Sequence, residues 1–182
     1  MGLQWLVAFN SSKTQSVLHS RLKGDGAPCN LQMYSRILQE KGAISLLDLT
    51  VSSNLSWKSY LQNVIKKAAQ RIGSLYRASR YLPPESILYS YKATIRPLME
   101  YCCYLWGGAP KSHLQLLDRV EKRAKNLMGQ QLANELLTLS VRRDVASLSL
   151  FYRYYFGKCS SALSESVPKT KALSKILLEP VH

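Results

Sequence analysis

The sequence is short of acidic residues, cysteines and long apolar runs, and each shortage excludes a class of protein. Its 182 residues include 11 Asp and Glu against 25 Lys and Arg, a net charge of +14. This excess argues against an acidic, sugar-hydrolase-like surface and favours a polyanionic partner, nucleic acid or an anionic membrane. The four cysteines contain no C-x-x-C pair, so neither a zinc ribbon nor a dense disulfide framework is supported. The longest apolar run near the start, Trp5 to Phe9, is too short for a signal peptide or a spanning helix.

Motifs for catalysis and metal binding are also missing. The three histidines are scattered without an H-E-x-x-H pattern, and no Walker A, G-x-G-x-x-G or G-x-S-x-G motif occurs. The four aspartates lie apart, so no pair is placed to hold the two cations of a metal-dependent polymerase. We therefore expect no catalytic residue, no metal site and no cofactor in this chain.

The pattern of apolar residues divides the chain into two parts and a tail. Residues 1–52 predict short strands, at 15–22 and 43–51, with a turn at 23–28. The strand at 43–51 is apolar almost throughout, Asp48 excepted, which predicts a buried strand. Residues 166–182 predict a loose tail. Residues 53–165 have helical periodicity and predict about five helices, over 56–81, 84–104, 112–128, 131–140 and 142–163. The expected fold class is α+β, mostly α, with short antiparallel strands followed by a helix bundle.

Single residues set the expected ends of these helices. Ser56 and Ser112 are the predicted N-caps of the first and third helices, and Gly129 ends the third. Pro97 lies inside the second helix and predicts a break or a kink there.

The first predicted helix separates apolar residues from basic ones. Apolar side chains that include Leu61, Val64 and Ala68 fall on one side, and no acidic residue occurs between Trp57 and Arg80. Like charges on a helix repel, and phosphates would relieve that repulsion with counterion release, which makes binding depend on salt. A solvated basic surface without a ligand is the alternative. The candidate nucleic-acid-binding residues of this helix are Lys58, Lys66, Lys67, Arg71, Arg77 and Arg80.

The third predicted helix mixes charges of both signs. Asp118 and Glu121 alternate with Arg119, Lys122 and Arg123. Such a mixture favours an ordinary packed helix with local ion pairs.

Several segments follow a pattern found in one family of polymerases. The segment Trp5 to Thr14 resembles a W-x-x-x-F-N-x-x-K-T element, and Ser45 to Trp57 resembles an L-L-G-L-T…L-S-W passage. Tyr91 to Pro110 resembles Y-K-x-x-I-R-P-x-x-E-Y…W-G-x-A-P, and Leu117 to Ala124 resembles L-D-x-V-Q-K-R-A. In this order and spacing, the segments resemble the region downstream of the catalytic aspartates in reverse transcriptases of non-LTR (LINE-type, jockey-like) retrotransposons. The resemblance covers about residues 1–165.

The resemblance implies a remnant of the polymerase palm over 1–52 and a helical thumb-like region over 53–165 that grips a template–primer duplex. Lys13 would lie in the palm element near the incoming nucleotide and is a further candidate nucleic-acid-binding residue. The family's metal-binding aspartates lie upstream, in palm and fingers domains that are missing here and are expected as partners. The resemblance also implies the backbone of an RNA–DNA or DNA duplex as a partner, and no membrane. Mg²⁺ belongs to the intact parent enzyme, and this chain alone is expected to be inactive. An intracellular location, cytoplasm or nucleus, is expected.

The chain departs from the family pattern at two positions that bear on structure. Asp48 stands where the family usually has Gly, and a charge in an apolar strand is costly unless paired or solvated. Glu121 stands where the family usually has Gln. A second hypothesis is a small basic helical interaction protein that binds an acidic protein or an anionic membrane.

Overall fold

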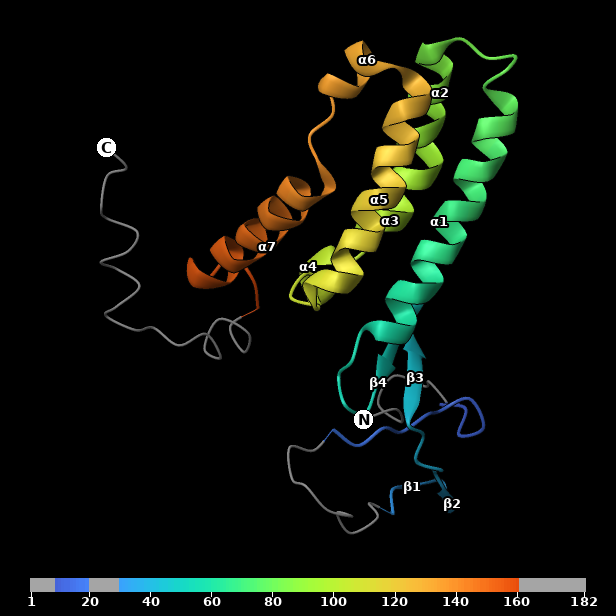
Figure 1. The fold of residues 1–182 in the computed structure, drawn as a ribbon. Coiled ribbons are helices and arrows are strands. Elements are labelled where there is room, and N and C mark those ends of the chain that lie inside the picture. The colour runs from blue at the N-terminus through green and yellow to red at the C-terminus, as the bar shows by residue number, and fades with distance from the viewer. Residues whose placement is uncertain (1–8, 20–29, 161–182) are drawn as a thin grey trace.

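A computed structural model describes residues 9–19 and 30–160 (Figure 1). The fold is mixed α+β and mostly helical, with two short antiparallel strand pairs before the helices. This arrangement confirms the expected fold class. The predicted turn at 23–28 and the predicted tail at 166–182 lie outside the described residues.

Two small hairpins form the N-terminal part. Strand β1 (Gln32–Met33) pairs with β2 (Arg36–Ile37), and β3 (Ala43–Leu46) pairs with β4 (Leu49–Ser52), each antiparallel. The predicted single strand at 43–51 is therefore wrong. The chain reverses at Leu47 and Asp48, whose φ angles of 48° and 63° are those of a two-residue type I′ hairpin turn. Asp48 is exposed in this turn, so its charge stays in water and does not carry the desolvation cost of a buried strand.

The other predicted strand, at 15–22, is not a strand where it is described. Residues 15–19 make a single bridge, in which Ser16 lies parallel to Glu40. The amide of Lys41 donates to the Ser16 carbonyl at 2.9 Å, and the Ser16 hydroxyl donates to the Gln39 carbonyl at 3.1 Å. The segment is thus fixed beside the β2–β3 connection without joining a sheet.

Helix α1 (Lys58–Ala78) is the longest element and follows the predicted pattern. Leu61 and Ala68 have no exposed area, and Trp57 and Ile65 pack against the core as partly buried residues. The helix begins two residues after Ser56, whose hydroxyl accepts from the Lys58 amide at 3.4 Å, so Ser56 is not the N-cap. The apolar side of α1 therefore faces the bundle, as the periodicity indicates.

The predicted second helix is broken into four pieces. Helix α2 (Pro84–Ser90) continues into a π-helical turn, η2 (Tyr91–Ile95), and then into α3 (Arg96–Glu100). Because Pro97 has no N–H and its ring crowds the preceding turn, the wider π-helical turn accommodates it, and the Arg96 amide bonds the Tyr91 carbonyl. The chain then breaks at Cys102, at a φ of 50°, before α4 (Cys103–Trp106). The expected break occurs, but its sharpest point follows Pro97 by five residues.

Three more helices complete the bundle: α5 (Lys111–Met128), α6 (Gln130–Asn134) and α7 (Leu139–Tyr155). Gly129 ends α5 at a φ of 82°, as predicted, because a side chain there would be strained. Ser112 lies inside α5 and is not its N-cap, a position that Pro110 occupies. The Thr138 hydroxyl caps α7 by accepting from the Val141 amide.

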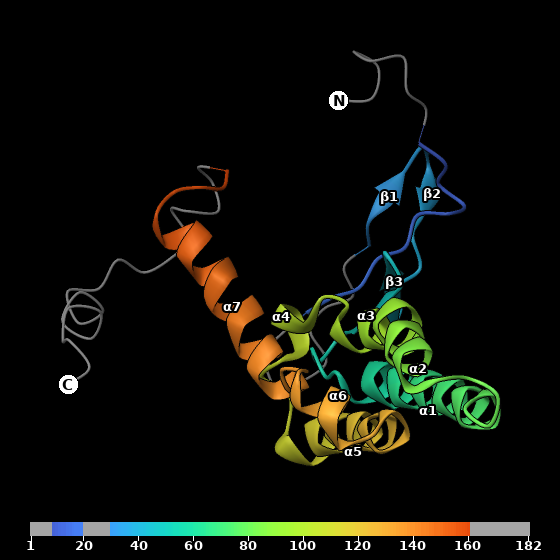
Figure 2. The same cartoon turned by 90° about the horizontal axis from the view of Figure 1, so that it is seen from above.

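The core lies where α1, the α2–η2–α3 run and α5 meet. Among its largest fully buried side chains are Trp106, Tyr91 and Leu117. The Trp106 indole donates to the Tyr101 carbonyl at 2.9 Å, which closes the break between α3 and α4. Helices α1 and α5 lie side by side in both views, and α7 extends away from them beside α4 (Figures 1 and 2).

Candidate nucleic-acid interface

All seven candidate residues are exposed, but they do not share one surface. Lys13 lies in a turn that hydrogen bonds to Asn10 hold in place. The side-chain oxygen of Asn10 accepts from the Ser12 amide at 2.9 Å, and the Asn10 backbone carbonyl accepts from the Lys13 amide at 3.1 Å. This turn lies beyond the β3–β4 hairpin, at the opposite end of the molecule from the last turn of α1 (Figure 1). Lys13 is therefore remote from the basic residues at the end of that helix.

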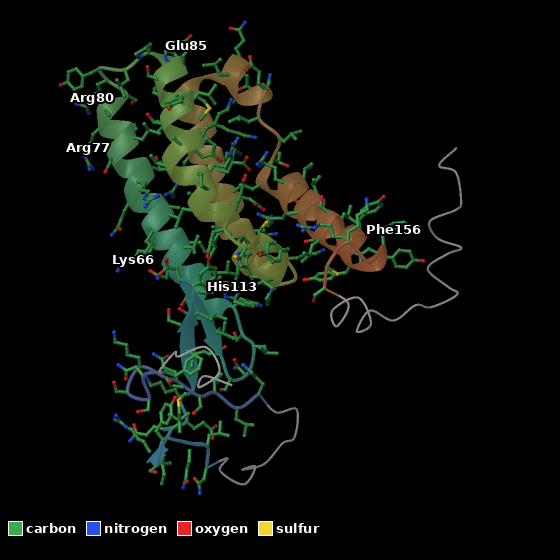
Figure 3. All side chains as sticks on the ribbon, turned by 180° about the vertical axis from the view of Figure 1, so that it is seen from behind. Lys66, Arg77, Arg80, Glu85, His113 and Phe156 are labelled. Carbon is green, nitrogen blue, oxygen red and sulfur yellow. The ribbon has the colours of Figure 1, made fainter. Side chains whose placement is uncertain are left out.

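The basic residues of α1 divide into three groups. Lys66 and Arg77 lie along the side of the helix that faces away from the other helices, and Arg80 lies on the same side just beyond the helix end at Ala78 (Figure 3). Lys67 and Arg71 line a groove between α1 and the α2–η2–α3 run.

Lys58 lines a separate cavity of about 430 Å³ near the start of α5, together with Trp57, Gly108 and His113. The sequence alone did not separate these three groups, because all of the residues lie off the buried stripe.

Helix α5 presents basic residues that sequence reasoning assigned to local ion pairs. Its two acidic residues turn toward α7: Asp118 accepts from both terminal nitrogens of Arg143 at 3.0 Å, and Glu121 is buried. With its acids engaged, the exposed charged residues of α5 are all basic: Lys111, Arg119, Lys122 and Arg123.

A signal for this division was present in the spacing. Asp118 and Glu121 are three residues apart and fall beside the buried Leu117 and Val120, whereas Arg119 and Arg123 lie one helical turn apart on the side opposite Leu117, and Lys122 lies one turn from Asp118. A helical-wheel projection of α5 that plots basic and acidic residues separately would have revealed a second basic surface.

Helices α1 and α5 pack along each other (Figure 2), and each carries exposed basic residues. We call a set of these residues, together with Arg80 just after α1, the outer basic surface. No described residue of α1 is acidic, and both acidic residues of α5 are bonded to α7, to α5 itself or to both. The exposed charged residues of both helices are therefore all basic, and the partly exposed Asp118 is paired with Arg143, which favours an anionic ligand. The surface comprises Lys66, Arg77, Arg80, Arg119, Lys122 and Arg123.

Burial perturbs the pKa of titratable groups in the interior. Burial raises the pKa of Tyr60 from 10.0 to about 12, and burial likewise raises the pKa of Tyr91, with the nearby Glu121 and Glu100 carboxylates adding to the effect. Burial also raises the pKa of the Cys103 thiol. These groups are thus held neutral inside the fold, which is the opposite of what an activated nucleophile needs.

The described residues hold no group of three or more His, Cys, Asp or Glu side chains that could bind a metal ion. Within the same residues, no helix is both long and apolar enough to cross a membrane. Comparison of the chain with protein-family models, with curated proteins and with solved structures finds no match.

Proposed function

We propose that this chain is the palm-edge and thumb-like part of a non-LTR retrotransposon reverse transcriptase, and that it binds the backbone of a template–primer duplex. The observation that carries the proposal is the outer basic surface, where the exposed charged residues of two packed helices are all basic and the partly exposed Asp118 is paired with Arg143. Sequence motifs in the order of that family's reverse transcriptases support the same origin independently.

The residues that carry the resemblance also have definite structural roles. Trp106 has no exposed area, and Pro110 starts α5. Glu100 accepts from Arg142 of α7, with an Nη2–Oε2 distance of 2.9 Å, and lies 3.8 Å from Arg96. These residues of the family pattern therefore help to hold the helix bundle together. Proteins that share a thumb-like fold need such residues in common, and this supports the proposed origin.

Binding through this surface would be electrostatic and independent of base sequence. Lysine and arginine contacts to phosphates fix the position of a protein on a duplex but carry no direct sequence information. Each phosphate neutralised releases counterions, so the logarithm of the affinity should fall linearly with the logarithm of salt, by about 0.9 per phosphate on duplex DNA.

Polymerisation by the chain itself is not part of the proposal. The family's reaction requires Mg²⁺ held by clustered carboxylates. The described carboxylates do not fit that role, because Glu100, Asp118 and Glu121 are paired with arginine or lysine and no cluster is present among the described residues. The required aspartates would come from the upstream palm.

Apolar side chains exposed on the hairpins support a polymerase palm as partner. Leu47 is 79% exposed and Leu46 57% exposed at the β3–β4 turn, and Tyr34 and Ile37 are exposed in the β1–β2 hairpin. Exposed apolar residues gathered in one part of a molecule are typical of a surface that packs against another polypeptide.

The test is a salt titration of the full chain against three targets: an RNA–DNA hybrid, a DNA duplex and vesicles of anionic lipid. We expect both nucleic acids to bind with similar affinity and a steep salt dependence. Binding to vesicles alone would reject the proposal in favour of a membrane-binding basic protein. Replacing Lys66, Arg77 and Arg80 with Gln should weaken duplex binding and flatten its slope, whereas R36Q, in strand β2 and outside the outer basic surface, serves as the control.

A further inference from the structure

A groove of about 960 Å³ runs along α1, opposite the α2–η2–α3 run. Its lining extends on α1 from Tyr60 to Ala78, a length of about 27 Å at the helical rise. The hairpin turn at Asp48 and the loop residue Leu82 also line it. The groove therefore has the length of a surface helix and is open to solvent along one side of the bundle.

The groove exists because of the sequence on both of its walls. Ser74 and Ala78 on α1 face Ala93 and Thr94 of η2, so small side chains line the space between the helices. The π-helical turn that accommodates Pro97 forms the facing wall. Such turns occur often at functional sites, because they re-aim the residues that they carry.

The floor of the groove is apolar and its α1 wall is basic. The buried Val64 and Ile95 lie at its bottom, and Leu82 and Leu98 supply its more accessible apolar lining. Lys67 and Arg71 lie one helical turn apart on the wall. Among the described lining residues, Asp48 is the one carboxylate, and it lies at the hairpin end.

Arg71 is positioned before any ligand arrives. Its Nη1 donates to the Thr94 carbonyl, so the side chain spans from α1 to η2. A guanidinium carries five N–H donors, and most of them stay available for a carboxylate. Because the side chain is already held, less conformational entropy is lost on binding.

We propose that this groove binds an amphipathic helix of a partner protein, with apolar residues on the floor and Asp or Glu side chains against Lys67 and Arg71. The proposal does not rest on nucleic-acid binding, because the two cations line the groove and are separate from the outer basic surface. Helix-in-groove binding uses an apolar stripe at i, i+3, i+4 and i+7 spacing, which a groove of this length accommodates.

The chemistry of the lining favours a peptide over a nucleic-acid backbone. A sugar–phosphate backbone has no apolar face to pack on the floor. Its polar groups would lose their hydrogen bonds to water there without gaining new ones. A carboxylate-bearing helix satisfies both parts of the groove, because its apolar face covers the floor while its acidic edge meets the cations.

The experiment uses the full chain and a fluorescent synthetic helix of about 18 residues, with leucines on one face and two glutamates four positions apart beside that face. Fluorescence anisotropy should show saturable binding that is about tenfold weaker when both glutamates are replaced by glutamine. Lys67→Glu should weaken binding of the glutamate peptide by a similar factor and strengthen binding of a peptide with lysines in place of glutamates. Lys67 is used because Arg71 also bonds Thr94, and circular dichroism should show that the K67E variant stays folded.

Lys66→Glu is the matched control, because Lys66 is the neighbouring residue but lies on the outer side of α1. It should leave peptide affinity unchanged. The proposal is overturned if glutamate and glutamine peptides bind equally, if neither saturates, or if K66E and K67E have equal effects. It is also overturned if an RNA–DNA hybrid displaces the peptide and K67E weakens hybrid binding as much as K66E does, because the groove would then belong to the nucleic-acid surface.

Discussion

Glu121 is the buried group through which α5 fixes α7, and its replacement gives the clearest stability prediction. Its Oε2 accepts from the Leu139 amide, at the first residue of α7, at 3.2 Å. Its Oε1 lies 3.3 Å from the Lys125 ammonium, and Glu121 itself is 6% exposed. The carboxylate therefore satisfies a helix-terminal N–H and places negative charge at the positive end of the α7 dipole.

Glu121→Ala should destabilise the fold by roughly 1.5–4 kcal/mol. An unsatisfied buried N–H costs about 1–3 kcal/mol, and loss of the favourable charge at the helix terminus adds about 0.3–1 kcal/mol. In a chain of this size the midpoint of thermal unfolding, Tm, should fall by roughly 5–10 °C. Lys125 adds little, because it also donates to the Leu136 carbonyl and reaches solvent.

Thermal and urea unfolding followed by circular dichroism measure the change. Glu121→Gln keeps an acceptor oxygen and should lose only about 1 kcal/mol, while Asp144→Ala, an exposed acid on α7, should stay within about 0.5 kcal/mol of the parent. Hydrogen exchange should show that the amides of α7 lose protection first in E121A. An E121A protein as stable as the parent, with α7 equally protected, would refute this account of how α7 is attached.

Three further changes test other parts of the fold. Gly107→Ala should lower the free energy of unfolding, measured in urea, by about 1–3 kcal/mol, because the added Cβ would lie 2.8 Å from the Cys103 carbonyl oxygen. Gly108→Ala, which has open space around it, should leave the free energy of unfolding unchanged. Stability should fall as pH rises from 10 to about 12, because the folded state raises the pKa of Tyr60 and so retains a proton that the unfolded chain releases. The Y60F variant should lose less stability over this pH range. An unchanged dependence of stability on pH in Y60F would contradict the raised pKa of Tyr60. Asp48→Gly should stabilise the hairpin by roughly 0.5 kcal/mol in the same urea assay, because glycine adopts the φ of 63° without strain, and a destabilised variant would contradict the type I′ turn.

Sequence reasoning was most successful where one local pattern decides the structure. The α1 stripe, the end of α5 at Gly129 and the break near Pro97 follow from helical periodicity and from backbone restrictions of single residues. These features depend on neighbours close in sequence, so the sequence is sufficient to predict them.

It failed where two local interpretations compete. Residues 43–51 are mostly apolar, and a hairpin turn there requires positive φ at Leu47 and Asp48, which neither residue favours. The Tyr101 hydroxyl donates to the Leu47 carbonyl at 2.8 Å, a contact 54 residues away in sequence that helps to fix this turn. The Gly of the family pattern at position 48 was a signal for the turn, because glycine favours positive φ.

The division of the candidate interface also needed tertiary structure. Lys66 and Lys67 are adjacent in sequence, yet one lies on the outer basic surface and the other lines the groove. Asp118 of α5 is paired with Arg143 of α7, which is 25 residues away in the sequence. Such long-range pairs leave little trace in a single sequence.

The central claim is that α1 and α5 together bind a nucleic-acid backbone, and a salt-dependent duplex titration tests it most directly. The parent chain is compared with one variant that carries K66Q and R77Q on α1 and with another that carries R119Q and R123Q on α5. Each pair should lower the magnitude of the slope of log affinity against log salt by nearly two, about 0.9 for each phosphate that is no longer neutralised, and the two reductions should add. Slopes and affinities that stay at the parent value in both variants would contradict the claim.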